Sequence, residues 1–269
     1  MFLIKKARKQ MNLQLLVSTI HQIDHSLLEK MNIQSDGIIV NQCDRNEFDE
    51  FEFKGHNIKF LSFAERGVGL SRNNALMRAT ANICLFADDD VTYVDNYEKH
   101  IEIAFLDNPE ADVIIFNVPS TNAERPSYII PKIKKVRWYN FLKYGAVRIA
   151  VRTEKLKQAN IYFSLLFGGG AKYSCGEDSL FIGECIKKGL KVYTNPTIIG
   201  YVSQEDSSWF KGYTDKFFFD KGALFACLSK RWAKLLCLQF VVRRYKLFFR
   251  DKTMLEAYRL MDKGRSVLK

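Results

Sequence analysis

The sequence has no C-x-x-C pair among its six cysteines, and several of them stand inside apolar runs. This distribution argues against a disulfide framework and indicates buried, reduced thiols in a reducing compartment. No apolar run reaches the length that crosses a membrane. The first ten residues place their charges after a very short apolar stretch, which is the reverse of a secretory signal. The chain also has no internal repeat and no low-complexity tract.

The composition is that of a folded, basic protein. The 269 residues are 47% hydrophobic, which is enough to bury a full core. Lysine and arginine number 41 against 30 acidic residues, and the resulting net charge of +11 predicts an anionic partner. A nucleotide phosphate, an acidic lipid surface and a nucleic acid all satisfy this expectation, and charge alone does not choose among them.

Apolar runs recur at intervals of roughly 25 residues in the first half of the chain. They lie at 13–17, 37–40, 58–61, 83–87 and 112–118, and another follows at 190–194. Segments with helical spacing of apolar residues lie between them, at 70–79, 96–106, 153–159 and 179–188. This alternation predicts an α/β fold with a mainly parallel central sheet flanked by helices.

The last fifty or so residues differ in character, since aromatic and aliphatic side chains are interleaved with lysine and arginine. We therefore divide the chain into a basic leader at 1–10, a main domain at 11–212 and a basic aromatic helical tail at 213–269. A helix of this composition either lies on an anionic membrane surface or packs on the domain with its charges in water. Periodicity alone does not separate these two interpretations.

The most informative segment is the apolar run 83–87, which ends in Asp88, Asp89 and Asp90. Open α/β sheets bind ligands at the carboxyl ends of their strands, and three carboxylates there are costly without a cation. In an extended backbone, Asp88 and Asp90 project to one side with Cβ atoms about 7 Å apart, close enough to share a divalent ion. A solvated loop or a helix N-cap is the alternative interpretation of the triplet.

Polar residues in other segments extend this candidate site. Thr19 and Asn41 follow two predicted strands and can hydrogen-bond a base or ribose. Arg66 and Arg72 flank a glycine turn at 67–69 that enters a helix, where backbone N–H groups and guanidinium forks can hold phosphates. A plain surface turn is the alternative for this last segment.

A second acidic pair, Glu177 and Asp178, follows a triple glycine at the start of a predicted helix. A carboxylate in this position often serves as an N-cap or complements the helix dipole. Together with the other segments, the pair completes a recognisable order of motifs.

This order resembles the family 2 glycosyltransferases, which have the GT-A fold and transfer a sugar from a nucleotide diphosphate sugar. The resemblance covers roughly residues 11–212 and includes a glycine turn followed by Arg-Asn at 67–73, an apolar strand into D-x-D, and a later G-E-D. The matching positions are Thr19, Asn41, 67–73, 86–90 and 176–178.

The resemblance implies a role for each matching residue of the first half. Asn41 stands where the family has a base-reading aspartate, and Arg72 where it has an arginine near the phosphates. Asp88 and Asp89 would lie near the ribose and the sugar. Asp90 would be the direct ligand of Mg²⁺ or Mn²⁺, which neutralises charge on the leaving diphosphate.

The resemblance also implies a mechanism. Asp178 would be the catalytic base that removes the acceptor hydroxyl proton during a direct displacement with inversion, and Glu177 would orient the site. Two positions depart from the family pattern. Asn41 replaces a charged acceptor and weakens the expected uridine preference, and no histidine follows the strand at 190–194, where Gln204 or Glu205 would have to take its place.

The sequence thus predicts an inverting glycosyltransferase that uses a UDP sugar, with a lipid-linked glycan as the expected acceptor in surface polysaccharide biosynthesis. We expect a cytoplasmic protein peripheral to the inner face of the plasma membrane, with no nucleic acid partner. One alternative is a metal-dependent nuclease or nucleotidyltransferase, and another is a non-catalytic module that binds anions or lipids.

Overall fold

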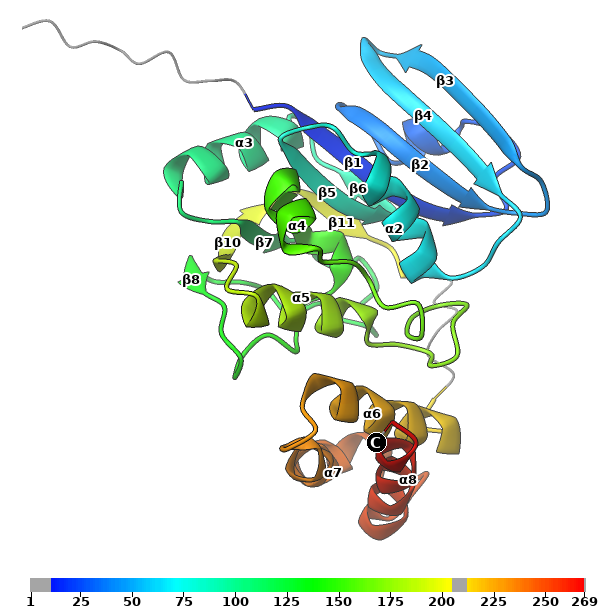
Figure 1. The fold of residues 1–269 in the computed structure, drawn as a ribbon, viewed down its shortest axis with the longest axis vertical. Coiled ribbons are helices and arrows are strands. Elements are labelled where there is room, and N and C mark those ends of the chain that lie inside the picture. The colour runs from blue at the N-terminus through cyan, green and yellow to red at the C-terminus, as the bar shows by residue number, and fades with distance from the viewer. Residues whose placement is uncertain (1–10, 205–211, 269) are drawn as a thin grey trace, which may run out of the picture.

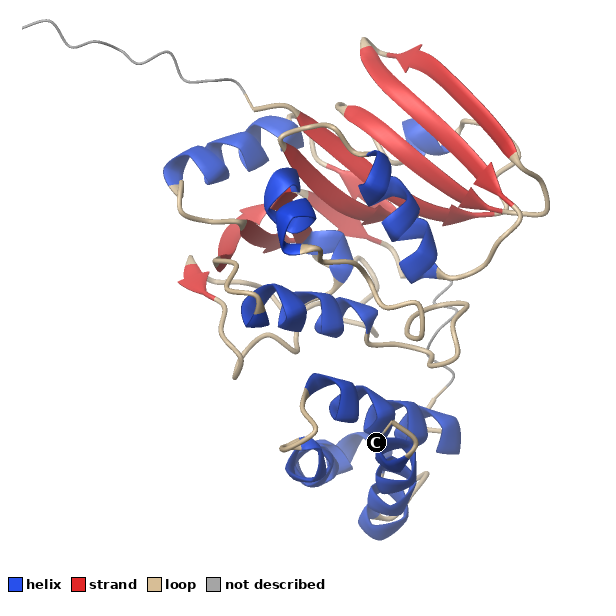
Figure 2. Cartoon of the chain, viewed as in Figure 1, coloured by secondary structure: helices blue, strands red, loops and turns tan. Residues whose placement is uncertain are grey.

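The computed structural model describes residues 11–204 and 212–268. The predicted basic leader at 1–10 therefore lies outside the described residues. In the described part, a large twisted sheet carries helices on both faces, and three helices at the C-terminal end form a separate cluster below it (Figure 1). Figure 2 shows that the strands are confined to the upper part and that the lower cluster is all helical.

Six strands of the main sheet arise from the apolar runs of the sequence, because runs of this length fit strands covered on both faces. They are β1 (Leu13–Ile20), β2 (Asp36–Gln42), β4 (His56–Phe63), β5 (Ile83–Asp88), β7 (Val113–Asn117) and β10 (Val192–Ile198). The remaining strands of this sheet are β3 (Glu47–Phe53), β8 (Lys134–Lys135) and β9 (Ile149–Arg152). A second, two-stranded sheet pairs β6 (Val91–Tyr93) with β11 (Gly200–Val202).

The nine strands lie in the order β3-β4-β2-β1-β5-β9-β7-β10-β8. The run β4-β2-β1-β5 is parallel, as is the pair β7 and β10. Strand β9 runs antiparallel between β5 and β7, and β3 and β8 are antiparallel at the two edges. The predicted α/β sheet is confirmed, and its pairing is mixed. Because β2, β1 and β5 are parallel neighbours, their carboxyl ends meet at one edge.

Two hydrophobic clusters fill the two faces of this sheet, since successive strand residues point to opposite sides. One cluster contains Leu15 of β1 with residues of α1 (Leu27–Lys30) and α3 (Tyr97–Asp107). The other contains Leu16 of β1 and residues of three helices on the opposite face. These helices are α2 (Val68–Arg78), α4 (Thr153–Ala159) and α5 (Glu177–Lys187). The four helices predicted from periodicity, α2 to α5, are present with bounds shifted by at most two residues.

The C-terminal helices are α6 (Asp215–Leu228), α7 (Ala233–Phe248) and α8 (Met254–Ser266). Helices α6 and α8 touch through their backbones, because a Cβ at Gly222 would overlap the Met261 carbonyl and one at Gly264 would overlap the Phe219 carbonyl. A third hydrophobic cluster fills the interior of the three helices and includes Phe167 and Tyr173 of the preceding loop. The tail is thus packed against the rest of the protein.

No helix of the described residues is long and apolar enough to cross a membrane.

Candidate functional site

The aspartate triplet lies where the parallel strands end. Strand β5 stops at Asp88, and Asp89 and Asp90 form a turn before β6. The extended backbone expected for the whole triplet is therefore wrong after Asp88. The turn directs Asp89 toward the end of β1, where the Thr19 hydroxyl donates a hydrogen bond of 2.5 Å to its carboxylate. Two of the predicted site residues, from segments 70 positions apart, are thereby brought together.

Arg72 joins the triplet to the second acidic pair. Its side chain is 3% exposed and donates to both carboxylate oxygens of Asp88, at 2.7 and 3.0 Å, and to Glu177 at 3.0 Å. Burial disfavours the charged guanidinium, but the two carboxylates outweigh it and hold the pKa of Arg72 above its ordinary value. Helix α2, strand β5 and helix α5 are therefore tied together at one charged centre.

Asp90 carries the least compensated charge of the triplet. No described cation pairs with it, and the nearby backbone N–H groups of Asp90 and Gln204 lower its pKa only as minor causes. Burial, followed by repulsion from Asp88 and Asp89, raises the pKa of Asp90 to about 6. A divalent cation would relieve both effects, so the chemistry of this carboxylate fits the metal that the sequence predicts.

The described residues contain no group of three or more histidine, cysteine, aspartate or glutamate side chains that could hold a metal by themselves. A cation beside Asp90 would therefore need ligands from its substrate, as Mg²⁺ does when it binds through one or two carboxylates and phosphate oxygens. The backbone of Gln204 lies near Asp90 and its side chain accepts from the Ser120 hydroxyl at 3.4 Å, so replacement of the family histidine by Gln204 remains a prediction, and Glu205 lies outside the described residues.

Asp178 lies at the start of α5, next to Glu177. Its carboxylate accepts the Ser179 N–H at 2.6 Å, but the N-cap of α5 is Gly176, so Asp178 lies in the first helical turn, where a negative charge complements the helix dipole. Burial raises the pKa of Asp178 most, and repulsion from the neighbouring Glu177 carboxylate raises it further, to about 7. Arg72 and Lys221 act in the opposite direction. A carboxyl group poised near neutral pH can accept a proton at physiological pH, which a simple helix cap does not require.

Glu177 is held more firmly than Asp178. One of its oxygens accepts from Arg72, and the other accepts the Gly176 N–H at 3.1 Å. Its position agrees with an orienting role, which remains a prediction.

Asn41 is fully buried, and its amide group is engaged within the protein. It accepts the Gln22 N–H at 2.9 Å, donates to the Gln22 carbonyl at 2.9 Å and donates to the Ser62 hydroxyl at 3.1 Å. Gln22 in turn donates to the Thr19 hydroxyl at 2.9 Å. Asn41 thus fixes the loop after β1 beside Thr19, and its predicted contact with a base remains a prediction.

The glycine turn differs from the phosphate cradle that we expected. The Gly67 N–H donates to the Gln42 side chain at 2.7 Å, and the Val68 N–H donates to the Gly169 carbonyl at 2.9 Å. These two backbone donors are therefore occupied by the protein. Arg66 is exposed and donates to the carbonyls of Cys43 and Glu65. Its guanidinium lies at the rim of the site, and phosphate binding by Arg66 and Arg72 remains a prediction.

The C-terminal helices contribute residues that motif order did not reveal. Asp220 of α6 is 1% exposed and accepts both the N–H and the hydroxyl of Ser174, at 2.8 and 2.7 Å. These bonds anchor the loop that leads directly into Glu177 and Asp178. Lys221, the next residue of α6, acts on the charge of Asp178. No local signal in the sequence distinguishes these two residues from the other charges of the tail.

Comparison with known families gives one match. The model of the family described as Glycosyl transferase family 2 matches residues 18–166, which include the aspartate triplet and Arg72 but not Glu177 or Asp178. No curated protein sequence matches the chain.

Solved structures give similar folds. The crystal structure of S. aureus TarS 1-349 in complex with UDP-GlcNAc has a TM-score of 0.65 and 17% sequence identity, and the match covers 96% of this chain and 84% of that one. The complex of TarS 1-349 with UDP has a TM-score of 0.63 and 17% identity, with 96% and 83% covered. At this identity the likeness is one of fold, and it confirms the predicted GT-A fold with additional C-terminal helices.

Proposed function

Because the chain belongs to glycosyl transferase family 2, we propose that it moves a sugar from a nucleoside diphosphate sugar to a glycan acceptor with inversion at the anomeric carbon. The observation that carries this proposal is the chain of contacts from Asp178 through Glu177 and Arg72 to Asp88. It joins a carboxyl group with the pKa of a general base to the acidic turn at the strand ends. These contacts would tie together the two halves of the proposed displacement site, one for the attacking hydroxyl and one for the leaving group.

In this mechanism Asp178 accepts the proton of an acceptor hydroxyl while the hydroxyl oxygen forms a bond to the anomeric carbon. The bond between that carbon and the diphosphate oxygen breaks, and the nucleoside diphosphate leaves. Asp90 would hold Mg²⁺ or Mn²⁺, which supplies positive charge to the diphosphate when bound. Glu177 and Arg72 keep Asp178 and Asp88 in fixed relation, so that little reorganisation accompanies the reaction.

The donor is proposed to be a UDP sugar. The similar TarS structures were determined with UDP and with UDP-GlcNAc, and this chain shares their fold. Thr19, Asp88 and Asp89 would face the nucleoside and the sugar, since they gather at the ends of β1 and β5, and the buried Asn41 would act by holding the loop after β1 in place. Membership of this family also favours sugar transfer over the nuclease, nucleotidyltransferase and binding-module alternatives.

The test is to incubate the protein with Mn²⁺, a mixed glycan acceptor and single α-configured UDP, GDP or dTDP sugars, and to follow anomeric protons by NMR. We expect one UDP sugar to be consumed and a β-linked product to form. Consumption of no donor would overturn the proposed activity, and an α-linked first product would overturn the direct displacement.

We also propose that the acceptor is lipid-linked, as in surface polysaccharide synthesis, and that helix α7 rests on an anionic membrane. The outward face of α7 leaves Leu235, Leu238 and Val242 each at least 50% exposed, among exposed basic residues. Apolar side chains at this spacing share one helical face, and with flanking cations they match the pattern of interfacial helices.

Replacement of Leu235 and Leu238 with glutamine should reduce binding to vesicles that contain anionic lipid by roughly tenfold, because two buried apolar side chains are lost from the interface. Co-sedimentation measures the bound fraction. Leu255→Gln on α8 is the matched control, since Leu255 is also exposed, at 57%. Equal vesicle binding by the double variant and the wild type would remove α7 from the membrane contact.

A further inference from the structure

Two stretches of the chain run longer without aspartate or glutamate than any others, at 125–153 and 221–250. The second contains α7, whose outward face we place on an anionic membrane. The first leads from β7 through β8 to β9, and we call its residues 128–144 the basic loop. Two segments far apart in the sequence therefore share a lack of negative charge, as an anionic surface requires of the protein that binds it.

The basic loop is fixed to the main domain by its backbone and by buried side chains. Its strand β8 pairs with β10 and forms an edge of the main sheet, and the Lys134 N–H donates to the Thr194 hydroxyl at 3.0 Å. Four of its side chains are buried in the core of the main domain, namely Ile130, Val136, Phe141 and Tyr144. The residues between these anchors are thereby presented on the surface by a folded segment.

Several large apolar side chains of the basic loop are exposed. The exposed fraction is 51% for Ile129, 55% for Ile133 and 41% for Trp138. Aliphatic side chains gain free energy when they leave water, and tryptophan favours the boundary between water and lipid. This part of the surface therefore favours contact with an apolar phase.

Exposed cations lie between these apolar side chains, namely Lys132, Lys134, Lys135 and Arg137. None of the four forms an ion pair with a carboxylate of a described residue. The combination favours a lipid surface over a nucleic acid. A bilayer takes up aliphatic side chains beside its anionic headgroups, whereas single-stranded nucleic acids stack on aromatic side chains.

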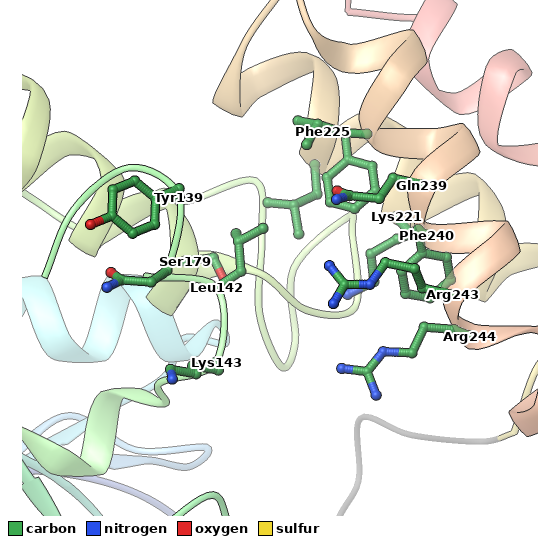
Figure 3. A pocket seen from close by; sticks show the side chains of 13 residues that line it. Tyr139, Leu142, Lys143, Ser179, Lys221, Phe225, Gln239, Phe240, Arg243 and Arg244 are labelled. Atoms are coloured by element: carbon green, nitrogen blue, oxygen red, sulfur yellow. The ribbon is translucent and has the colours of Figure 1, made fainter. Parts of the chain in front are cut away.

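The basic loop is a neighbour of α7 in the folded protein. Tyr139 of the loop and Phe240 of α7 line opposite sides of a cavity of about 490 Å³ (Figure 3). A second approach lies at Gly183 of α5, where Trp138 packs beside Leu228, the last residue of α6. The two acid-free segments are thus brought together by the packing of the C-terminal helices on the main domain.

We propose that the basic loop is a second membrane-contact surface, which rests on the membrane-associated function proposed above. The lysines and Arg137 meet anionic lipid headgroups, and the exposed apolar side chains enter the boundary with the acyl chains. A single helix on a membrane leaves the protein free to rotate about the helix axis. A second contact, from the main domain, fixes the orientation of the sheet and of the candidate site relative to the lipid.

The charge part of the contact is tested by co-sedimentation of the full chain with vesicles that contain anionic lipid. The triple substitution Lys132→Gln, Lys134→Gln and Lys135→Gln should weaken binding by roughly 100-fold at low salt, because each lysine near an anionic surface contributes about fivefold. The matched control removes three exposed lysines from other helices, namely Lys30 of α1, Lys99 of α3 and Lys155 of α4. Its effect should be much smaller, since charges more than a Debye length from the lipid are screened.

The apolar part is tested in the same assay by Ile129→Ser with Ile133→Ser. This change should weaken binding by roughly tenfold or more and leave its salt dependence steep, whereas the triple lysine variant should flatten that dependence. The matched control is Ile23→Ser with Ile103→Ser, at side chains that are 87% and 53% exposed on other parts of the main domain.

Insertion is measured by the fluorescence of Trp138. The chain has three tryptophans, and Trp209→Phe with Trp232→Phe leaves Trp138 as the only one. Brominated lipid in anionic vesicles should quench its emission. Vesicle-bound protein without quenching, or loop variants that bind vesicles as the wild type does, would overturn the inference.

Equal losses in the matched controls would overturn it as well, since the effect would then be one of net charge or of general surface polarity. A triple lysine variant that binds vesicles normally but loses affinity for a soluble nucleic acid would assign the cations to that ligand and also overturn it. Weakened loop variants beside an unaffected α7 variant would support the loop contact and refute that of α7. Failure to consume any nucleotide sugar in the NMR test would refute the proposed activity, which these binding measurements do not use.

Discussion

Replacement of Asp178 with asparagine is expected to lower kcat for sugar transfer by roughly 10²–10⁴-fold, the range that general base catalysis contributes. Asparagine has nearly the same shape but cannot accept the acceptor proton at neutral pH. The Kd for the nucleotide should stay within about twofold, because Asp178 contacts the attacking group and not the leaving group in this mechanism. Steady-state kinetics and nucleotide titration measure the two quantities separately. Asp215→Asn, a change at an exposed carboxylate of α6, is the control.

The same variant should be more stable than the wild type at alkaline pH. The pKa of Asp178 is raised to about 7 by burial and by Glu177, so the folded state favours the protonated carboxyl. An unfolded aspartate has a pKa of about 3.9, and the wild type therefore loses stability as the pH rises from about 4 to about 7. The Tm difference between Asp178→Asn and the wild type should grow across this window and stay constant above it. A Tm difference between the variant and the wild type that is the same at pH 5 and pH 8 would show that folding does not raise the pKa of Asp178.

Replacement of Asp90 with asparagine is expected to lower kcat/KM for the donor by about 100-fold or more, since the cation that we propose there stabilises the leaving diphosphate. The change removes the carboxylate whose charge no described cation compensates. In the absence of metal, the variant should be at least as stable as the wild type at pH 8, because burial raises the pKa of Asp90 to about 6 and its ionisation is costly.

Thermal shift with Mn²⁺ and UDP measures the cation dependence directly. The wild type should be stabilised by the two ligands together more than by UDP alone, and Asp90→Asn should lose that difference. Asp107→Asn, at the exposed end of α3, is the control. An unchanged response to Mn²⁺ in Asp90→Asn, together with normal kcat/KM, would remove this residue from the metal site.

The elements that the sequence predicted well are those whose burial is uniform. Strands such as β1 and β5 are buried on both faces, so their sequences are continuous apolar runs. Strand β3 was missed because it is an edge strand in which glutamate and aspartate alternate with phenylalanine. Strand β9 was missed because its four residues lie in a segment of irregular pattern, and only insertion between β5 and β7 buries them.

The sequence likewise predicted one part of the candidate site and missed another. Motif order brought together the segments that contain Asp88, Arg72 and Glu177, and the structure joins them although Arg72 and Glu177 are 105 positions apart. Motif order could not show that Arg72 would be buried between two carboxylates, since that depends on how α2 and α5 pack. It also left open whether the tail lies on a membrane or packs on the domain, and it could not show that Asp220 and Lys221 of α6 face the active-site loop.

The most direct test of the account is the pH dependence of kcat/KM for the acceptor, measured at saturating donor and Mn²⁺ so that Asp90 is occupied. Under these conditions the profile reports the ionisation of the base in the donor-bound enzyme. We predict that the rate rises about tenfold for each pH unit below a midpoint near 7, the pKa of Asp178, and levels off above it. The residual activity of Asp178→Asn should lack this rise. A wild-type profile that is flat between pH 5 and pH 9, or a variant that keeps the same midpoint, would contradict the assignment of Asp178 as the base.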